Sequence, residues 1–593
     1  MSDNYNTFLD VEVSLKGKRW VDRLSDNDRN QALAIAQETG MPELLARVLC
    51  GRGVAKDNAE QFLNPNLKDL MPDPSTMTDM DKAVDVLVSS IIAKDRVAIF
   101  GDYDVDGASS SALLSRFLTA LDITNEIYIP DRIFEGYGPN PNAMKTLVDA
   151  GAKLIVTVDC GSTSFEALEA ANKLGVKLLV IDHHQCGDEL PIADAIVNPN
   201  RQDDLSDLGT LCAAGVVFMV LVAVQRELRK RSLPVGPNLM EMLDIVALAT
   251  VCDVVPLIGL NRAFVVKGLN AMRKRKNAGI SALSKVSRLD GPIQPYHLGF
   301  LLGPRINAGG RIGDAALGSR LLTLEDEYEA EQIAEQLEGL NKERQEIEAV
   351  MLEEAINEAE AEIGLGDGPS VLVTARTGWH PGIVGLLASR LKDRFSRPAF
   401  AVAFDPSGKG AASGRSISGV DIGKAVRDAV DEGILVKGGG HAMAAGLTIQ
   451  KDRLGDLRAF FEDALSEQIA KARQSQVTKI DGALTARGAN LRFIELLATA
   501  GPYGQGHSQP VFAFPNHLIQ HSRLVGKDHI SLTLKSADGT PLKAIAFRAA
   551  DEDMGRALMD GQGRHFHFVG TLGTNTWQGR QSVQLRVMDA APV

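Results

Sequence analysis

The sequence predicts an α/β protein in which a long helix joins two α/β domains and a β-barrel follows at the C-terminal end. Between residues 96 and 255, short apolar runs alternate with helix-like stretches, which is typical of a parallel sheet covered by helices. Residues 325–363 contain no proline and one glycine, and their apolar residues recur in helical steps of three, four or seven. From about residue 477, short alternating runs between turn residues indicate a small barrel.

Length and composition are those of a multidomain globular protein. A chain of 593 residues exceeds what one hydrophobic core supports, so we expect several domains. Its 45% hydrophobic and 23% charged residues are ordinary for a soluble protein. There is no signal-peptide pattern or membrane-length apolar run, and the five cysteines form no CxxC pair. We therefore expect a cytoplasmic protein with free thiols and no membrane partner.

We expect five segments in chain order. They are an N-terminal cap or linker at 1–81, a first α/β domain at 82–320, an acidic connecting helix at 321–365, a second α/β domain at 366–474 and the barrel at 475–593. The strands of the first sheet are expected at the apolar runs 96–100, 126–130, 153–158, 177–181 and 195–197.

The connecting helix concentrates the negative charge. Between Glu325 and Glu362, fifteen acidic residues stand against Lys342 and Arg344, which accounts for the whole net charge of −13. At 1.5 Å per residue this helix is roughly 57 Å long, enough to join two domains. Its charge is either that of a plain solvated helix or a means of repelling DNA from that surface. The neutral remainder leaves room for basic patches elsewhere.

Acidic and imidazole side chains follow three of the predicted strands. The motif GDYDVDG comes after the first strand, and the runs KLIVTV and KLLVI end in further polar residues. In order, these groups are Asp102, Asp104, Asp106, Asp159, Asp182, His183 and His184. Asp253 follows another apolar stretch. Because ligands of an open α/β sheet bind beyond the C-terminal ends of its strands, these groups should converge.

Such a cluster predicts a metal site. A single aspartate after a strand is more often a helix N-cap than a ligand, but groups at three strand ends favour a shared site. Carboxylates in one pocket raise one another's pKa unless a cation compensates them. Carboxylates with imidazole suit Mn²⁺ or Mg²⁺ better than Zn²⁺, because Cys186 has no second thiolate at zinc spacing. Two such ions are the usual means of cleaving phosphodiesters.

Several motifs resemble those of the DHH phosphoesterase family. GDYDVDG, VTVDCG, IDHH and ATVCDVVPL occur in the family's order and approximate spacing. The later GPRINAGGR and GGGHAMAAG look like motifs of the family's single-stranded-DNA exonucleases, the second within a companion DHHA1 domain. The resemblance extends from about residue 98 to 446, and the barrel is similar to the OB-fold of the same enzymes. It implies a catalytic DHH domain, a substrate-binding DHHA1 domain and a nucleic-acid-binding OB domain.

The resemblance also implies roles for individual residues. Asp104 and Asp159 would hold one ion. The second ion would be held by Asp106, Asp159, His183 and Asp253, so that Asp159 bridges the two. His184 would face the scissile phosphate. Phe100 stands where many family members carry a metal-ligating histidine, which predicts a weaker or more hydrated first site.

Arginines and small residues in glycine-rich segments are candidates for holding phosphates. The planar guanidinium pairs with phosphate oxygens, and small residues let backbone amides approach an anion. We expect glycine-rich turns to present Arg305, Arg311, Ser413, Arg415 and His441. The resemblance implies that they bind the terminal 5′ phosphate and its neighbours. Judged on the residues alone, each arginine can equally stabilise the fold.

Two further groups are candidates for contact with the strand. Arg132 and Tyr137 should lie on the rim of the metal site, although a tyrosine between glycines can simply form a turn. The barrel offers charge and aromatic faces of the kind that bind single strands, from Arg580, Arg586, Trp577 and Phe566. For Phe566, packing in the barrel core is the better interpretation.

These inferences predict a metal-dependent exonuclease of single-stranded DNA. The 5′ to 3′ direction, the role in DNA recombination and repair, and partnership with a single-stranded DNA-binding protein and a helicase are implied by the resemblance alone. One alternative is a DHH phosphodiesterase for short oligonucleotides or cyclic dinucleotides, which would not need the barrel. Another is a non-catalytic scaffold on the same fold, against which the intact metal motifs argue.

Overall fold

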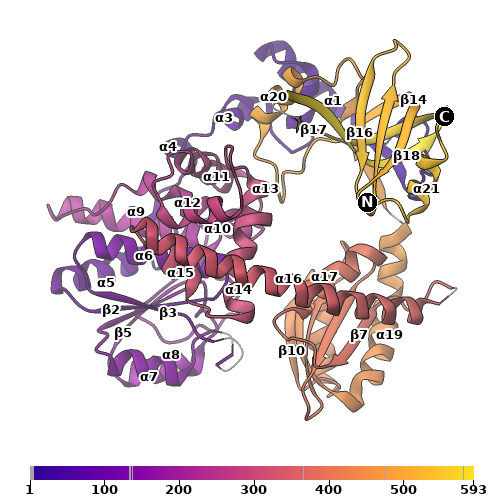
Figure 1. Cartoon of the computed structure of the whole chain (residues 1–593). Coiled ribbons are helices and arrows are strands. Elements are labelled where there is room, and N and C mark those ends of the chain that lie inside the picture. Colours follow the sequence, from indigo (N-terminus) through magenta and orange to yellow (C-terminus); the bar gives the residue numbers. More distant parts are fainter. Residues whose placement is uncertain (1–5, 132–134, 137, 365, 475, 578–579) are drawn as a thin grey trace.

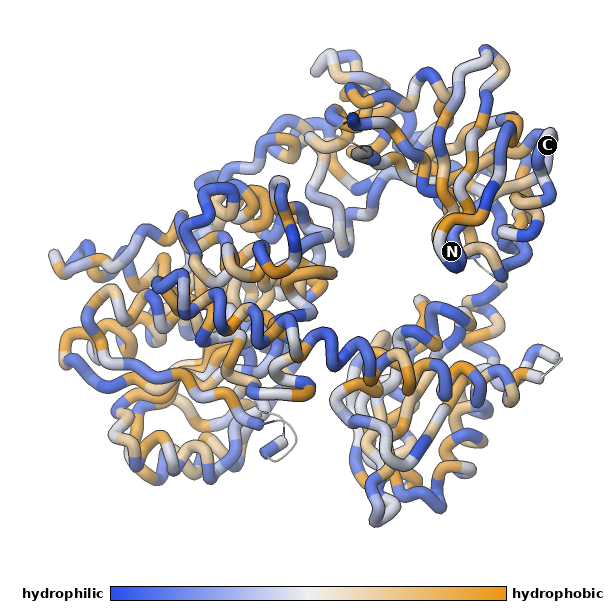
Figure 2. Tube along the Cα trace, viewed as in Figure 1, coloured by the Kyte–Doolittle hydropathy of each residue, from blue (hydrophilic) through white to orange (hydrophobic). Residues whose placement is uncertain are grey.

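The computed structural model describes the chain except residues 1–5, 132–134, 137, 365, 475 and 578–579. Its parts follow one another around a ring: the first sheet with its helices, a long helix, the second sheet, the barrel, and N-terminal helices that lead back toward the first sheet (Figure 1). Hydrophobic segments gather inside each part, while the long helix is largely hydrophilic where it passes from one domain to the next (Figure 2).

A parallel sheet forms the centre of the first domain. Its strands lie in the order β3-β2-β4-β5-β6 and all pair in parallel. They are β2 (Val97–Gly101), β3 (Asn125–Tyr128), β4 (Leu154–Val158), β5 (Lys177–Ile181) and β6 (Ala195–Val197). All five predicted apolar runs are therefore confirmed as strands. Strands β2 and β4 are buried along their whole length, as expected for strands covered on both faces.

Helices cover both faces of this sheet (Figure 1). One face packs against α5 (Met80–Ala93), α6 (Val105–Ala120) and α9 (Ala213–Lys230), and the other against α7 (Pro141–Asp149) and α8 (Phe165–Lys173). A helical extension completes the domain. It consists of α10 (Leu243–Cys252), α11 (Gly259–Met272), α12 (Ala278–Val286), α13 (Pro295–His297), the π-helix η4 (Leu298–Leu302), α14 (Gly303–Ile312) and α15 (Leu317–Thr323).

The predicted connecting helix is α16 (Glu327–Ile363), 37 residues long. It contacts α12, α14 and α15 of the first domain, and then α17 and β7 of the second. Ile333, Leu337 and Met351, three of the apolar positions that predicted the helix, are buried. The acidic residues between them face solvent or pair with nearby basic residues, so one stripe of this helix is shared between two domains.

The second domain has a mixed sheet in the order β10-β11-β9-β8-β7, in which only β7 and β8 are parallel. Its strands are β7 (Leu372–Thr377), β8 (Ala399–Phe404), β9 (Lys409–Arg415), β10 (Lys437–His441) and β11 (Ala444–Gln450). Its helices are α17 (Val384–Phe395), α18 (Ile422–Asp431) and α19 (Leu454–Gln474). Both the parallel α/β domain and this second α/β domain were predicted.

The C-terminal part is a closed barrel, because β14 pairs with both β15 and β17. Its strands are β13 (Gly482–Ala483), β14 (Phe512–Val525), β15 (His529–Lys535), β16 (Pro541–Ala546), β17 (His565–Trp577) and β18 (Arg580–Pro592). Helices α20 (Leu491–Ala500) and α21 (Asp553–Met559) accompany them. Phe566 is buried in the barrel core, which confirms its interpretation as a packing residue.

The N-terminal segment belongs to the same folded unit as the barrel. Strand β1 (Arg19–Asp22) pairs in parallel with β12 (Val477–Ile480). The helices α1 (Asp26–Thr39), α2 (Glu43–Cys50) and α3 (Ala59–Leu63) share a core with the barrel strands, and α4 (Leu67–Leu70) packs against α11 of the first domain. Buried Asp481, just after β12, pairs with Arg23 and Arg52 from the N-terminal segment. The two ends of the chain thus form one domain.

All five cysteines are free thiols, as predicted. Among the described residues, no helix combines the length and the apolar character needed to cross a membrane.

Candidate metal centre and phosphate-binding residues

The predicted metal ligands lie at the C-terminal ends of three neighbouring strands. β2 leads to Asp102, Asp104 and Asp106, β4 to Asp159, and β5 to Asp182, His183 and His184. The chain passes from β2 to β3 on one side and then returns to β4 on the other, so β2 and β4 flank the point where the strand order reverses. That point is where open α/β sheets bind their ligands.

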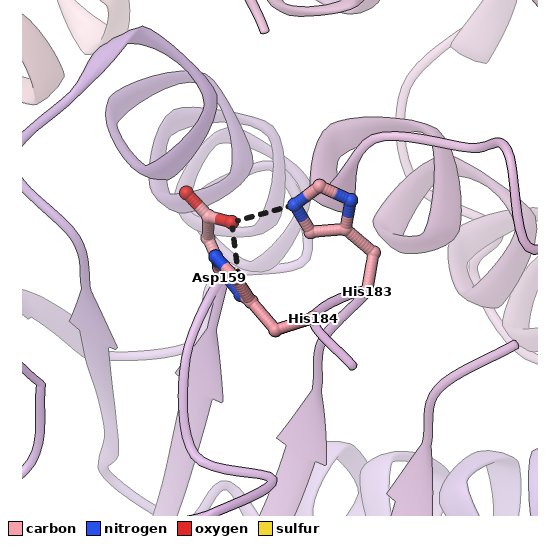
Figure 3. Close-up of side chains that lie close together, drawn as sticks. All are labelled: Asp159, His183 and His184. Atoms are coloured by element: carbon pink, nitrogen blue, oxygen red, sulfur yellow. Dashed lines mark ion pairs between the residues drawn. The ribbon is translucent and has the colours of Figure 1, made fainter. Parts of the chain in front are cut away.

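Side chains from all three strands and from the end of α10 converge on one another. The Nε2 atom of His183 lies 3.2 Å from Oδ1 of Asp159, 3.7 Å from Oδ2 of Asp106 and 3.8 Å from Oδ2 of Asp253. Figure 3 shows that one carboxylate oxygen of Asp159 faces both histidine rings, and Nδ1 of His184 lies 3.9 Å from this Oδ1 atom. Asp253, for which no strand was predicted, reaches the cluster as the C-cap of α10.

Three overlapping groups of potential ligands can be recognised among the described residues. They are Asp106, His183 and Asp253, then Asp159, His183 and His184, and finally Asp102, Asp104 and Asp159. Within each group of three the potential ligand atoms lie within 4.8 Å of one another. Oδ1 of Asp159 is buried and accepts no hydrogen bond from any described residue. Since a buried carboxylate oxygen needs a partner, this atom fits a cation.

Backbone groups hold the ligands in place. Asp104 caps α6 by accepting bonds from the amides of Asp106 and Gly107, at 2.9 and 3.1 Å. Asp106 accepts bonds from the amides of Ala213 and Ala214 at the start of α9, at 2.6 and 2.9 Å. Asp104 therefore caps a helix and lies in the cluster at once, so the two interpretations of a strand-end aspartate hold together for this residue.

His183 is oriented by a backbone carbonyl. Its Nδ1 lies 3.1 Å from the carbonyl oxygen of Leu211, which can only accept, so Nδ1 carries the proton. That leaves the lone pair of Nε2 facing the carboxylates. A ligating histidine that donates its other N–H to a carbonyl is the usual arrangement at protein metal sites.

The buried carboxyl groups raise one another's pKa. Burial, together with the charges of Asp106 and Asp104, raises the pKa of Asp253 to about 9. Burial also raises the pKa of Asp106 and Asp159, and the other aspartates of the cluster raise that of Asp159 further. Such a group of carboxylates is stable as anions only with positive charge among them, which a divalent cation supplies.

His184 forms a separate pair with Asp182. Its Nδ1 lies 2.8 Å from Oδ1 of Asp182. Burial would lower the pKa of His184, but the hydrogen bond to Asp182 and the carboxylate charge raise it to about 9. The same pairing outweighs burial at Asp182 and lowers the pKa of that carboxyl group. His184 is therefore a protonated side chain at neutral pH, half exposed at the edge of the cluster.

Phe100, at the position of the family's histidine, supplies no ligand. It is fully buried on the opposite face of the sheet from α6 and stacks on Tyr128 with ring centroids 5.5 Å apart. A weaker first site remains a prediction.

The segment GPRINAGGR is helical, which corrects our expectation of a glycine-rich turn. It forms α14 (Gly303–Ile312), and its glycines serve close packing. A Cβ on Gly310 would lie 2.9 Å from the side chain of Tyr103, and one on Gly309 would lie 2.8 Å from the carbonyl oxygen of Asp314. The glycines therefore let α14 approach the loop that carries Asp102 and Asp104. This close packing outweighs the low helix propensity of glycine.

The arginines of α14 point to other protein groups. Arg305 pairs with Glu338 of α16 through its Nε, at 2.7 Å, and donates to the carbonyl of Leu301. Arg311 donates to the carbonyl of Gly382 in the second domain, at 2.8 Å. Arg305 thus helps to connect α14 with α16, and Arg311 joins the two α/β domains. Phosphate binding by either arginine stays a prediction.

The second sheet brings the other predicted phosphate ligands together. Ser413 and Arg415 lie at the end of β9 and His441 at the end of β10, so the expected turns are strand ends. Arg415 and His441 both pair in register with Ala444 of β11, one on each side. Ser413 and Arg415 also lie against Gly385 in the first turn of α17, where a Cβ would come within 3.2 Å of both side chains. Arg415 is half-buried and His441 is exposed.

Two aromatic residues at the metal-proximal end of the helical extension were not anticipated. Tyr296 and Phe300 stack with centroids 4.9 Å apart and are 59% and 68% exposed. They lie on α13 and the π-helix, whose Leu298 carbonyl contacts Cys252, the neighbour of Asp253. Their spacing of four residues on one helix face was a usable signal. Arg132, Tyr137 and the side chain of Trp577 lie outside the described residues.

The fold and this cluster define a DHH-type phosphoesterase architecture. Three family models match the chain: the DHH family N-terminal domain at residues 96–250, the DHHA1 domain at 368–467 and the RecJ OB domain at 480–589. The chain therefore belongs to the RecJ family, as the motifs predicted.

Curated relatives match nearly the whole chain. It is 37% identical over 568 residues to the single-stranded-DNA-specific exonuclease RecJ of Dickeya dadantii, covering 93% of this chain and 96% of the relative. The RecJ proteins of Escherichia coli and Bacillus subtilis are 36% and 33% identical, with 96% and 71% of their lengths covered.

Solved structures agree with this assignment. RecJ of Thermus thermophilus in complex with Mn²⁺ superposes with a TM-score of 0.77 at 27% identity, covering 95% of this chain and 78% of that one. A second structure of the same protein, in complex with Mg²⁺, gives a TM-score of 0.72 at 26% identity and covers 95% of this chain and 77% of that one.

Proposed function

We propose that this chain is a metal-dependent exonuclease that hydrolyses phosphodiester bonds of single-stranded DNA in the 5′ to 3′ direction. The observation that carries the proposal is the convergence of Asp104, Asp106, Asp159, His183 and Asp253 at the C-terminal edge of the first sheet. The names of the relatives, single-stranded-DNA-specific exonucleases, supply the substrate. The direction and the role in recombination and repair follow from the same kinship.

The donor set suits two Mn²⁺ or Mg²⁺ ions. Asp104 and Asp159 would hold one ion. Asp106, Asp159, His183 and Asp253 would hold the other. When bound, such ions supply a nucleophile at neutral pH and compensate the charge of the reacting phosphate. Carboxylate oxygens and one imidazole, without thiolates, match the preferences of these ions.

His184 would act directly on the substrate. Because Asp182 keeps it protonated, His184 can act as a charged donor to a phosphate oxygen beside the ligands. A charged donor fixed before the substrate arrives stabilises the negative charge that develops during hydrolysis. Asp182 is thus a positioning residue, and its carboxylate also accepts a bond from the amide of Ser162, at 3.0 Å.

The end of the second sheet would bind the terminal 5′ phosphate. Ser413, Arg415 and His441 offer a hydroxyl, a guanidinium and an imidazole on adjacent strands. Holding a terminal phosphate at a fixed place would impose the direction of digestion. Tyr296 and Phe300 offer a stacking surface beside the metal centre, and the barrel would extend the track for the strand. Arg132 and Tyr137 remain predicted contacts.

A single-stranded DNA-binding protein and a helicase are the partners that this function calls for in the cytoplasm, since the substrate must be unwound and is otherwise coated. This part of the proposal rests on kinship with the RecJ proteins.

The proposal is tested by digesting a single strand labelled separately at each end, with Mn²⁺ or with EDTA, beside matched duplex and dinucleotide substrates. Metal-dependent loss from the 5′ end of the single strand is expected, with Asp159→Ala inactive and the exposed Asp149→Ala variant fully active. Cleavage of dinucleotides alone would replace the proposal by a phosphodiesterase of short substrates. Inertness with Mn²⁺ would replace it by a non-catalytic scaffold.

A further inference from the structure

A loop of the barrel domain docks directly beside the metal centre of the first domain. The loop comprises residues 501–507, between α20 and β14, and extends from the barrel toward the helical extension (Figure 1). The amide of Leu257 donates to the carbonyl of Gln505 at 2.8 Å. Leu257 lies four residues after Asp253, so the loop touches the segment that carries a predicted metal ligand.

Two glycines of the loop have no room for a side chain. A Cβ on Gly506 would lie 2.9 Å from Cβ of Pro256, and Gly506 also has a φ of +67°. A Cβ on Gly504 would lie 2.7 Å from Cδ1 of Leu257. The loop therefore packs closely on residues 256–257. A side chain at Gly506 would press on Cβ and Cα of Pro256, and one at Gly504 would press on the side chain of Leu257.

The segment that the loop contacts is strained. Val254, the residue after Asp253, has a φ of +60° and is 62% exposed. A β-branched residue adopts this left-handed conformation only where the surrounding structure imposes it. The side chain of Val254 is exposed, so its conformation is imposed through the backbone: its amide donates to the carbonyl of Val251 at 3.3 Å, and the residues that follow, Pro256 and Leu257, are held by the loop.

Adjacent residues at the start of α11 connect this docking to both sides of the metal centre. The buried side-chain amide of Asn261 donates to the carbonyls of Pro256 and Thr210, at 3.1 and 2.7 Å. Thr210 precedes Leu211, the residue whose carbonyl orients His183. Asn261 therefore ties the segment after Asp253 to the loop that orients His183.

The next residue, Arg262, anchors the barrel loop itself. It is 2% exposed, donates to the carbonyls of Phe62 and Gly501, and lies with its guanidinium carbon 4.1 Å from the centroid of the Phe62 ring. Burial lowers its pKa to about 10. A buried arginine satisfied by carbonyls from two distant segments fixes their mutual position. Three parts of the chain, namely α3, α11 and the loop, meet at this side chain.

We propose that the loop 501–507 is a positioning element of the metal centre: by holding Pro256 and Leu257 it fixes Asp253, and through Asn261 it supports the orientation of His183. The seating of the barrel domain then sets the affinity for the ion that Asp253 and His183 share. The inference deepens the proposed function and rests on it only in taking Asp253 and His183 as ligands. A loop that merely joined two domains would leave ion binding unchanged.

The test compares two glycines with the same backbone conformation in the full-length chain. Gly506→Ala introduces a Cβ against Pro256, whereas Gly526→Ala, at a φ of +66° in the turn between β14 and β15, meets nothing within 4 Å. Both substitutions carry the same local backbone cost, so their difference reports the contact. Mn²⁺ binding is measured by calorimetry and by the electron paramagnetic resonance of free Mn²⁺, and kcat and KM are measured on a dinucleotide.

We expect Gly506→Ala to weaken the binding of one of the two ions about tenfold, as loss of support around metal ligands typically does. Its kcat on the dinucleotide should fall, while Gly526→Ala matches the unsubstituted chain in both readouts. Gly504→Ala, which presses only on the Leu257 side chain, should show a smaller effect and carries the test if Gly506→Ala does not fold. Unchanged Mn²⁺ affinity in both loop variants would overturn this inference but leave the proposed function intact. Failure of the unsubstituted chain to bind Mn²⁺ overturns the proposed function.

Discussion

The candidate metal centre of the first domain and the proposed phosphate-binding end of the second domain are built in different ways. At the metal centre, Asp106 and Asp159 are buried, and backbone amides or carbonyls hold Asp106 and His183 in place. At the end of the second sheet, Arg415 is half-buried and His441 is exposed. The carboxylates of the first site repel one another, which a cation would compensate, whereas the second site carries basic side chains that are open to solvent.

The largest expected effect concerns the stability of the metal-free protein. The pKa of Asp253 is about 9 in the folded chain and about 3.9 in an unfolded one. Between these values the folded state binds more protons, so stability should fall as the pH rises from about 4 to about 9. Together with Asp106 and Asp159, whose pKa values are also raised, the loss should be on the order of 3 kcal/mol or more.

Thermal unfolding between pH 5 and 9, in EDTA and in Mn²⁺, measures this loss. Because ions bind deprotonated ligands, Mn²⁺ should stabilise the protein more as the pH rises, so the two profiles should diverge. Asp253→Asn, which removes one of the raised groups, should flatten the EDTA profile. Parallel profiles in EDTA and Mn²⁺ would show that the carboxylates are not compensated by a cation.

The second prediction contrasts two arginines that the sequence did not distinguish. Arg415 donates to the carbonyl of Gly414 at the open end of β9, whereas Arg305 is paired with Glu338. Arg415→Ala should raise KM for a 5′-phosphorylated strand about tenfold, the effect of one lost charged hydrogen bond. It should also reduce the preference over a 5′-hydroxyl strand. Arg305→Ala should leave KM unchanged and lower the melting temperature, because it removes the largely buried ion pair with Glu338, which then keeps only Lys342. Equal effects on KM would contradict this division.

Local sequence was sufficient to predict the strands of the first sheet and the candidate metal ligands that follow them. Each strand of the first sheet is an apolar run, and ligands that follow strands in sequence meet in space because parallel strands end at one edge. The helical GPRINAGGR segment was not predictable in this way, because its Gly310 packs against Tyr103, about two hundred residues earlier in the chain. The pairing of β1 with β12 likewise depends on contacts across more than four hundred residues. Nothing in the local sequence singled out the loop 501–507, and its proposed role follows only from its place against Pro256.

The smallest expected effect is at the exposed aromatic pair. Tyr296 and Phe300 form the one stacked and exposed pair of large rings that the described residues place next to the segment of Asp253. Base stacking on such a ring is worth about 1–3 kcal/mol, so Tyr296→Ala or Phe300→Ala should each raise KM for single-stranded DNA about fivefold, at the lower end of that range.

The two positions should act on the strand and not on the chemistry. Because neither ring contacts a predicted ligand, kcat on a dinucleotide should remain at the level of the unsubstituted chain. Tyr328→Ala removes a ring that is 72% exposed on the acidic helix α16, where no stacking with DNA is expected, and serves as the matched control. A KM effect equal to that of Tyr328→Ala would show that Tyr296 and Phe300 are surface residues with no part in DNA binding. A KM effect confined to long strands would place them on the path that the DNA takes toward the metal centre.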